Sequence, residues 1–221
     1  MSVEYVDPDI GGIGHLLKAT YPTIYRPHGM VGVTPQFDPK VGDRYLADHI
    51  HGFPVPVHLH RNSTSPQLMP VTGSPAPAIE NCASTFDHDF ETTAPHTYQV
   101  LLERYDINAE FTITRHGVIY RFTFPQAQSP CLLLATQQAS IDSADGPTIE
   151  GHQEFRGGVT GYFSICFDRP ASSRDQLQSG LRLHFAGSAP IEVRIGVSLI
   201  DAAQARRNRE TELGDRPFAQ L

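Results

Sequence analysis

An alternation of apolar and polar side chains with a period of two runs through most of the chain after Thr97, and it constrains the fold more than any other feature. Every second residue between 191 and 199 is apolar, and residues 97–103 and 110–124 show the same pattern. Such alternation is typical of β-strands with one buried face. Because these strands follow one another with turns and almost no helix between them, the pattern predicts an all-β fold, namely a β-sandwich.

Two local signals place a turn and a helix within this pattern. The dipeptide His116-Gly117 separates two alternating runs and predicts the turn of a hairpin. The only segment with a credible helical pattern covers residues 202–213, and Asp201 directly before it is a candidate N-cap. We therefore expect one short helix close to the C-terminal end of an otherwise all-β chain.

Charge and hydropathy exclude several classes of partner. The 221 residues carry a formal net charge of −7 with no block of like charges, which argues against nucleic acid or an anionic membrane as a partner. The basic run Arg206-Arg207-Asn208-Arg209 is interleaved with acidic residues and predicts a solvated helical face. No apolar run is long enough for a membrane span, and residues 1–10 lack the pattern of a signal peptide.

The cysteines give no sign of redox or nucleophilic chemistry. Cys82, Cys131 and Cys166 are far apart, and none lies in a Cys-x-x-Cys motif. Because Cys131 and Cys166 fall within apolar runs, we expect both to be small residues of the core.

The first ninety residues differ from the rest because proline, glycine and histidine interrupt every apolar run. The segment 20–39 contains four prolines and two glycines. These residues predict rigid, irregular loops, and apolar loops of this length are usually functional or pack against another element. A plainer alternative is an arm that covers the edge of a sheet.

Five motifs in this order resemble a known family. They are VDPDIGGIGH, TYPTIYRPHGMVGVTP, DHIHGF, QLMPVTG and ERYDINAEFTITRHGVIYRFTFP. Together they resemble the amino-terminal domain of glycoside hydrolase family 92, whose enzymes are calcium-dependent, inverting α-mannosidases. The close of the chain, VRIGVSLIDAAQARRNRETEL, is similar to the last sandwich strand and the start of the linker in that family.

The resemblance implies that this chain forms a sandwich domain and that a second domain carries out catalysis. Residues 1–200 would form the sandwich, and residues 201–221 would begin the linker to a helical-barrel catalytic domain. The acid, the base and the calcium site belong to that second domain in the family, so no catalytic residue, metal or cofactor is expected here. The chain would be a piece of a longer protein, one half of a split system, or a member without the catalytic domain. Family resemblance also suggests export, with the signal peptide absent here.

Four polar residues in the resembling motifs are our candidates for binding the substrate. They are His15, His28, Asp48 and His49, which all adjoin glycine or proline loops. Asp48 would orient His49 through a carboxylate–imidazole hydrogen bond, as polar groups in clefts often require. The alternative is that Asp48 only caps a turn.

Two other clusters carry weaker signals. The histidines of DHIHGFPVPVHLH, which are His49, His51, His58 and His60, form two pairs at strand spacing and could ligate a transition metal, or could be solvated. The acidic residues of FDHDFE alternate, which favours a solvated strand edge over an acid–base pair.

One departure from the family pattern weakens the case for mannose. After DHIHGF the chain reads PVPVHLHRNSTSPQ instead of a Ser/Gly-rich loop, and it contains no tryptophan to stack on a sugar.

We expect the chain to form one wall of a glycan site and to pack on a helical-barrel catalytic domain. The expected partners are that domain and a mannose-containing glycan, with self-association through an apolar surface between Ile13 and Met30. The alternative function is a stand-alone carbohydrate-binding or assembly module without hydrolytic activity.

Overall fold

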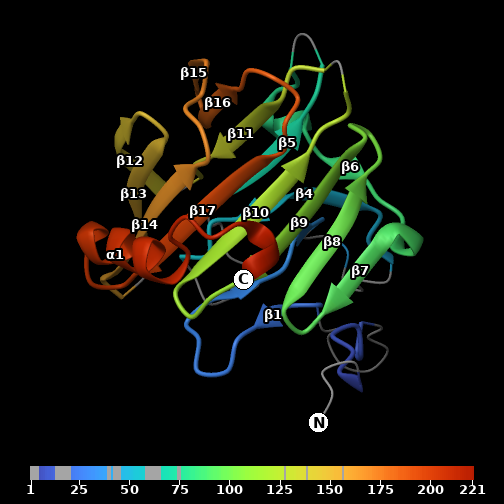
Figure 1. The fold of residues 1–221 in the computed structure, drawn as a ribbon, viewed down its shortest axis with the longest axis horizontal. Helices are drawn as coiled ribbons and strands as arrows, with labels where there is room; N and C mark the ends of the chain where they lie inside the picture. The colour runs from blue at the N-terminus through green and yellow to red at the C-terminus, as the bar shows by residue number, and fades with distance from the viewer. Residues whose placement is uncertain are drawn as a thin grey trace.

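The computed structural model describes residues 5–12, 21–38, 41, 46–57, 66–73, 76–126, 128–137, 139–155 and 157–221. Its strands form two antiparallel sheets that pack face to face, with one short helix on the outside (Figure 1). This confirms the predicted all-β sandwich.

The larger sheet has eight strands. Their spatial order is β12 (Ala139–Asp145), β13 (Thr148–Phe155), β14 (Val159–Phe167), β17 (Ile191–Ser198), β10 (Gly117–Thr123), β9 (Ile107–Ile113), β8 (Thr97–Leu102) and β7 (Glu91–Ala94). The hairpin predicted at His116-Gly117 is present as β9 and β10, which pair in antiparallel register.

The smaller sheet has seven strands. Its order is β15 (Ser173–Leu177), β16 (Gly180–His184), β11 (Cys131–Ala135), β5 (Gln67–Val71), β4 (His49–Pro54) and β3 (Gln36–Phe37), and β6 (Ser84–Thr85) also pairs with β4. A separate pair consists of β1 (Ile24–Tyr25) and β2 (Gly32–Val33). The remaining elements are the helix α1 (Ala202–Glu212) and the 3-10 turns η3 (Ile79–Asn81), η4 (His88–Phe90) and η5 (Phe218–Gln220).

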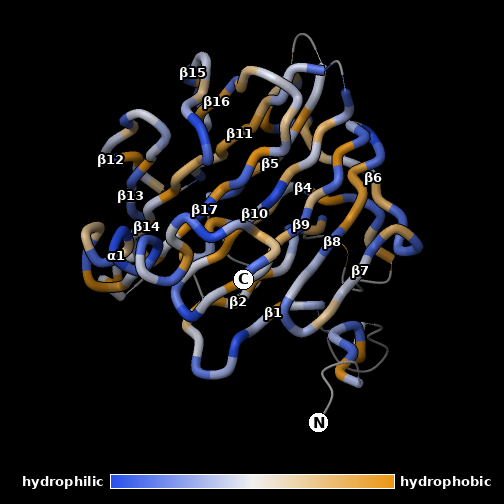
Figure 2. Tube along the Cα trace, in the orientation of Figure 1, coloured by the Kyte–Doolittle hydropathy of each residue, from blue (hydrophilic) through white to orange (hydrophobic). Residues whose placement is uncertain are grey.

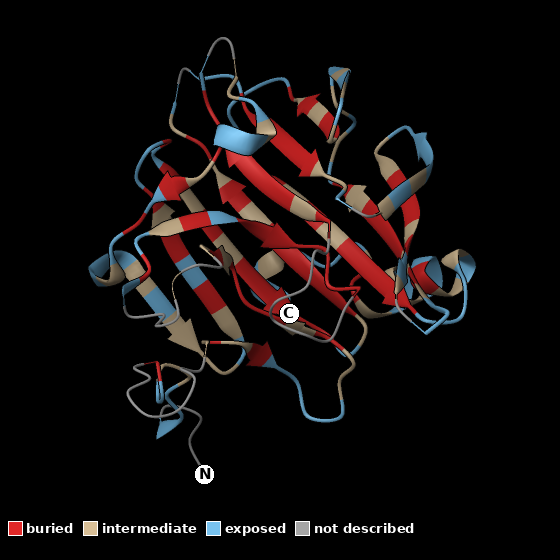
Figure 3. Cartoon of the chain, turned by 180° about the vertical axis from the view of Figure 1, so that it is seen from behind, coloured by how far each residue is buried: buried red, intermediate tan, exposed pale blue. Residues whose placement is uncertain are grey.

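The alternation in the sequence becomes the inner and outer faces of the sheets. Apolar and polar residues alternate along the strands (Figure 2), and buried residues concentrate in the central strands of both sheets (Figure 3). Ile191, Val193, Ile195 and Val197 of β17 are fully buried, whereas Leu199 lies beyond the strand and is exposed.

Aromatic side chains join the two sheets at the centre of the core. The ring of Phe53 on β4 lies 5.8 Å from Tyr120 and 5.5 Å from Phe122, both on β10 of the opposite sheet. The Tyr120 hydroxyl donates to the carbonyl of Pro54 at 2.6 Å, so this buried polar group is satisfied across the sandwich.

The predicted N-cap of the helix is confirmed. Asp201 accepts a hydrogen bond from the backbone N–H of Gln204 at 2.6 Å, and α1 then lies on the outer face of the larger sheet (Figure 1). Beneath it, small or polar residues form one row across four strands. The row consists of Gly117, Gly196, Ser164 and Glu150.

The basic run of α1 is solvated, as its charge pattern predicts, at Arg206 and Arg207, which are exposed, but it also contacts the sheet. Arg206 donates from Nε and Nη2 to both carboxylate oxygens of Glu150, at 2.7 and 2.5 Å, and Arg209 donates to Ser164 Oγ at 3.2 Å. The charge pattern did not predict these two contacts, which form because the helix crosses a row of small and polar residues on the sheet.

The end of α1 is fixed to the β9–β10 turn. Glu212 accepts a hydrogen bond from the backbone N–H of His116 at 2.9 Å and lies 2.5 Å from its ring Nδ1. Burial pushes the pKa of Glu212 upward, but hydrogen bonds from His116 and Thr114 outweigh it, and the net pKa is lowered. The hydrogen bond from Arg206 lowers the pKa of Glu150 in the same direction.

Because Glu150 and Glu212 hold α1 on the sheet, we expect the stability of this attachment to decrease in acid. A carboxylate whose pKa is lowered by folding stabilises the fold above its unfolded value, about 4.5, and loses that contribution as pH falls through the folded value. We expect the free energy of unfolding to fall as pH drops from about 5 toward 3. Urea denaturation at a series of pH values measures this. The double variant Glu150→Gln/Glu212→Gln should show a shallower dependence, and an equal slope in both proteins would contradict the assignment.

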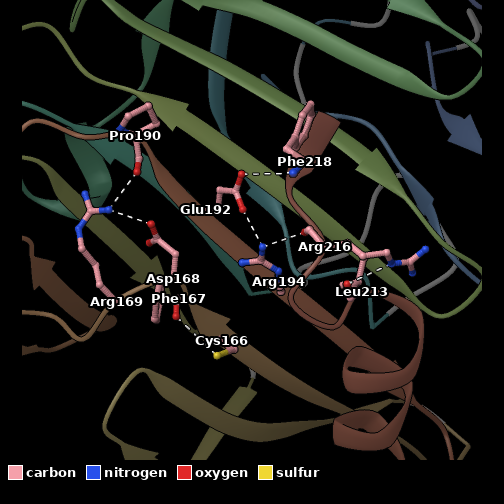
Figure 4. Close-up of polar contacts among 10 residues, drawn as sticks. All are labelled: Cys166, Phe167, Asp168, Arg169, Pro190, Glu192, Arg194, Leu213, Arg216 and Phe218. Atoms are coloured by element: carbon pink, nitrogen blue, oxygen red, sulfur yellow. Dashed lines mark hydrogen bonds and ion pairs between the residues drawn. The ribbon is translucent and has the colours of Figure 1, made fainter. Parts of the chain in front are cut away.

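The segment after α1 returns across the outer face of the larger sheet (Figure 4). Arg194 donates from Nη2 to Glu192 at 2.7 Å and to the carbonyl of Arg216 at 3.0 Å, and the backbone N–H of Phe218 donates to Glu192 at 3.3 Å. The guanidinium of Arg121 lies 4.3 Å from the centre of the Phe218 ring. The helix and this segment thus pack on the sandwich, and their role as the start of a linker stays a prediction.

Two of the three cysteines are buried. Burial raises the pKa of Cys82 and of Cys131 to about 11, so neither is a ready nucleophile. Cys166 is only partly buried, which corrects the expectation of a core residue. Alternation along β14 turns its neighbours Ile165 and Phe167 inward and Cys166 toward the outer face.

Among the described residues, none of the helices combines the length and the hydropathy that crossing a bilayer requires.

Candidate functional site

Asp48 and His49 stand where β4 begins, beside the short strand β6. His49 is in register with Thr85 of β6, and the backbone N–H of Phe86 donates to the carbonyl of Asp48 at 3.2 Å. On the other side, Ile50 of β4 is in register with Phe37 of β3. The backbone that carries the two residues is therefore held by strands on both sides.

The predicted carboxylate–imidazole hydrogen bond is present. His49 Nδ1 lies 2.6 Å from Asp48 Oδ1. The side chain of Asp48 is 78 % exposed and that of His49 is 43 % exposed, so the pair faces solvent. This hydrogen bond also holds the pKa of Asp48 below its usual value, which keeps the carboxylate charged.

The arrangement defines what the pair can do chemically. With Nδ1 donating to the carboxylate, the imidazole presents Nε2 as an acceptor, or as a donor when the ring is protonated. The second carboxylate oxygen of Asp48 offers a further acceptor. Neighbouring sugar hydroxyls both donate and accept hydrogen bonds, so they are chemically complementary to these two groups.

His28 lies at a different place in the sandwich. It is exposed in a turn with φ of +58°, a left-handed conformation in which histidine is enriched among non-glycine residues. Two residues later, the backbone N–H of Met30 donates to the carbonyl of Arg115 at 2.7 Å, which sets this turn beside the β9–β10 hairpin turn.

His28 and the Asp48–His49 pair therefore lie near opposite ends of β9. Thr85, the partner of His49, accepts from the backbone N–H of Glu103 just before β9 begins. The seven residues of β9, at about 3.3 Å each, span roughly 20 Å. The structure brings Asp48 and His49 together and leaves His28 at the far end, while His15, His58 and His60 lie outside the described residues.

The acidic motif FDHDFE is solvated, as its alternation predicts, at Asp87 and Asp89, but not at Glu91. Asp87 caps the 3-10 turn η4 by accepting from the backbone N–H of Asp89 at 2.9 Å. The side chain of Glu91 is only 4 % exposed, and it lies 2.8 Å from His88 Nδ1 while accepting from the Tyr98 hydroxyl at 2.5 Å. The expectation fails for Glu91 alone, because the turn η4 directs its side chain inward to the hydroxyl of Tyr98 on the neighbouring strand β8.

A chain of four rings connects this buried carboxylate to the motif segments. Tyr21 stacks on Phe37 at 5.7 Å, Phe37 contacts Phe86 at 5.7 Å, and Phe86 meets the edge of His88 at 4.9 Å. The rings come from three segments that the sequence separates, so the motifs TYP, QFD and STFDHD converge on one side of the sandwich.

Comparison with known proteins places the chain in a family. The model of the glycosyl hydrolase family 92 N-terminal domain matches residues 5–198. The chain belongs to this family. A search of curated proteins finds no match.

Solved structures of family GH92 proteins share the fold of this family 92 domain. A family GH92 inverting mannosidase from Bacteroides thetaiotaomicron superposes with a TM-score of 0.83 at 20 % identity. A family GH92 alpha-mannosidase from the same organism superposes with a TM-score of 0.78 at 21 % identity. Both matches cover 99 % of this chain, but only 34 % and 36 % of the respective relatives. The chain therefore spans about a third of the length of these relatives.

In the described part of this family 92 domain, the candidate site does not match the ligand set that calcium prefers. This described part contains no group of three or more histidine, cysteine or acidic side chains placed to hold a metal ion. Calcium prefers six to eight oxygen ligands, and the Asp48–His49 pair provides one carboxylate and a nitrogen. The residues of this pair do not fit the ion.

Proposed function

We propose that this chain is the sandwich part of an α-mannosidase-like glycoside hydrolase. It forms one wall of the glycan site and packs on a helical-barrel catalytic domain. The observation that carries the proposal is the family 92 match over residues 5–198 in a chain that spans about a third of its mannosidase relatives. One of these relatives was solved in complex with mannoimidazole, which supports a mannose-type sugar as the ligand class.

In this function the sandwich binds and orients the glycan, and the second domain supplies the catalytic acid and the catalytic base. Inverting hydrolysis needs two carboxylates about 6.5–9.5 Å apart to admit a water molecule. The Asp48–His49 pair is a carboxylate with an imidazole, and its exposed polar atoms suit hydrogen bonds to sugar hydroxyls. His15 and His28 remain further candidates for binding, and His28 would act away from this pair.

The first test separates the enzyme part from a stand-alone module. We expect the purified chain not to hydrolyse aryl α-mannosides, with or without calcium, because the acid and the base lie in the second domain. The chain joined to its cognate catalytic domain, on one polypeptide or as a separate subunit, should hydrolyse them. Calcium-dependent turnover by the chain alone would overturn the proposal, as would glycan binding by the chain that the catalytic domain neither strengthens nor converts into turnover.

The second test concerns Asp48. In the two-domain enzyme, Asp48→Asn is expected to lower kcat/KM about tenfold or more, roughly 1.4 kcal/mol in the barrier, without a change in melting temperature. The reason is that an amide cannot hold the imidazole as a carboxylate does. Michaelis–Menten kinetics and calorimetry measure the two quantities.

A matched control is available on the distant β12–β13 hairpin. Asp142 lies 2.9 Å from the ring of His152 and its side chain is 46 % exposed, so Asp142→Asn alters another solvent-facing carboxylate–imidazole pair outside the site. It should leave kcat/KM unchanged. If Asp48→Asn lowers the melting temperature and spares kcat/KM, the residue only caps a turn.

A further inference from the structure

Glu91 is a buried carboxylate with a donor at each oxygen. It opens β7, the edge strand of the larger sheet, with Oε2 2.8 Å from His88 Nδ1 and Oε1 2.5 Å from the Tyr98 hydroxyl. A carboxylate this deeply buried is costly unless hydrogen bonds satisfy it, so its position is tied to these two donors.

Tyr98 makes one end of this cluster rigid. Its side chain is fully buried on β8, and its ring stacks on Phe111 of β9 at 5.1 Å with an interplanar angle of 20°. Glu91 therefore links the ring of His88, on the short turn η4, to a fixed point in the sheet.

The contacts of His88 lead to the Asp48–His49 pair. The ring of Phe86 meets the edge of the His88 ring at 4.9 Å and 78° and is almost completely buried. The backbone N–H of the same Phe86 donates to the carbonyl of Asp48. Phe86 therefore connects the ring of His88 with the backbone that carries Asp48.

We propose that the cluster of Tyr98, Glu91 and His88 positions the Asp48–His49 pair for glycan binding. This rests on the proposed function, and it assigns Glu91 as a positioning residue that does not touch the sugar. Its carboxylate fixes His88, His88 fixes Phe86, and Phe86 fixes the start of β4. Loss of the carboxylate should therefore loosen a pair that it does not contact.

The experiment replaces Glu91 by glutamine, which keeps the shape but removes the charge. In the two-domain enzyme we expect KM for an aryl α-mannoside to rise about threefold to tenfold, with kcat within about twofold. In the 221-residue chain, NMR should show the His49 imidazole resonances displaced toward their positions in the Asp48→Asn variant. If Glu91→Gln does not fold, Tyr98→Phe removes a single hydroxyl, keeps the stacked ring, and should produce the same two changes at smaller size.

A matched control distinguishes positioning from stability. Glu110 forms a two-point ion pair with Arg121, at 2.8 and 2.7 Å, on the outer face of the same sheet. Glu110→Gln should lower the melting temperature but leave KM and the His49 imidazole resonances as in the wild type. If Glu91→Gln does the same, the cluster is only structural and the proposal is overturned.

A failure of the proposed function would give a different result from a failure of this positioning proposal. If Asp48→Asn and His49→Gln leave KM unchanged, the pair does not bind substrate. The His49 imidazole resonances in Glu91→Gln then still decide whether the cluster positions the pair.

Discussion

Replacing Phe53 by alanine is expected to lower the free energy of unfolding by about 3–5 kcal/mol. The side chain is fully buried, and its ring contacts Tyr120 and Phe122 on the opposite sheet at 5.8 and 5.5 Å. Truncation would leave a cavity between the two sheets at a place where strands of both contribute rings. Such a cavity cannot close without moving one sheet toward the other.

Denaturation in urea, monitored by circular dichroism, measures this loss as a lower midpoint at an unchanged slope. Phe90→Ala is the control, because Phe90 is 60 % exposed and its removal should change stability by no more than about 0.5 kcal/mol. A loss below about 1 kcal/mol for Phe53→Ala would show that the sheets do not depend on this contact.

The sequence predicts the strands that have one buried face and misses those that have none. The alternation after Thr97 identifies β8, β9, β10 and β17, because each buries every second side chain. The strands β12 and β15 close the far edges of the two sheets and are mostly exposed, so no alternation marks them.

Near the candidate site, the sequence predicts the contact that is local in the chain. The Asp48–His49 hydrogen bond joins neighbouring residues, and residue chemistry alone suggests it. The position of His28 depends on a backbone contact between Met30 and Arg115, which the sequence separates widely. The burial of Glu91 likewise depends on Tyr98 of the adjacent strand and on the turn η4. Neither could be anticipated without the register of the sheets.

Replacing Gly196 by valine is expected to detach α1 from the sheet and to cost about 1–3 kcal/mol or more. A Cβ at this position would lie 2.3 Å from the carbonyl oxygen of Ala205 and 2.6 Å from the backbone nitrogen of Arg209. Both atoms belong to the helix backbone, so no side-chain rotation relieves the clash. Valine favours strands, so local propensity alone would predict a gain for this change in β17. A loss of stability therefore reports on the helix contact.

Hydrogen exchange separates detachment of the helix from general destabilisation. In Gly196→Val, amide protection should fall in residues 202–213 by a larger factor than in β9 and β10. Gly146→Asn serves as the control, because a Cβ there meets nothing within 4 Å and asparagine tolerates its φ of +50°. The ion pair between Arg206 and Glu150 should be lost together with the helix contact, so adding Glu150→Gln to Gly196→Val should cost little more. Full additivity of the two changes would mean that the helix stays in place and that the row of small residues does not hold it.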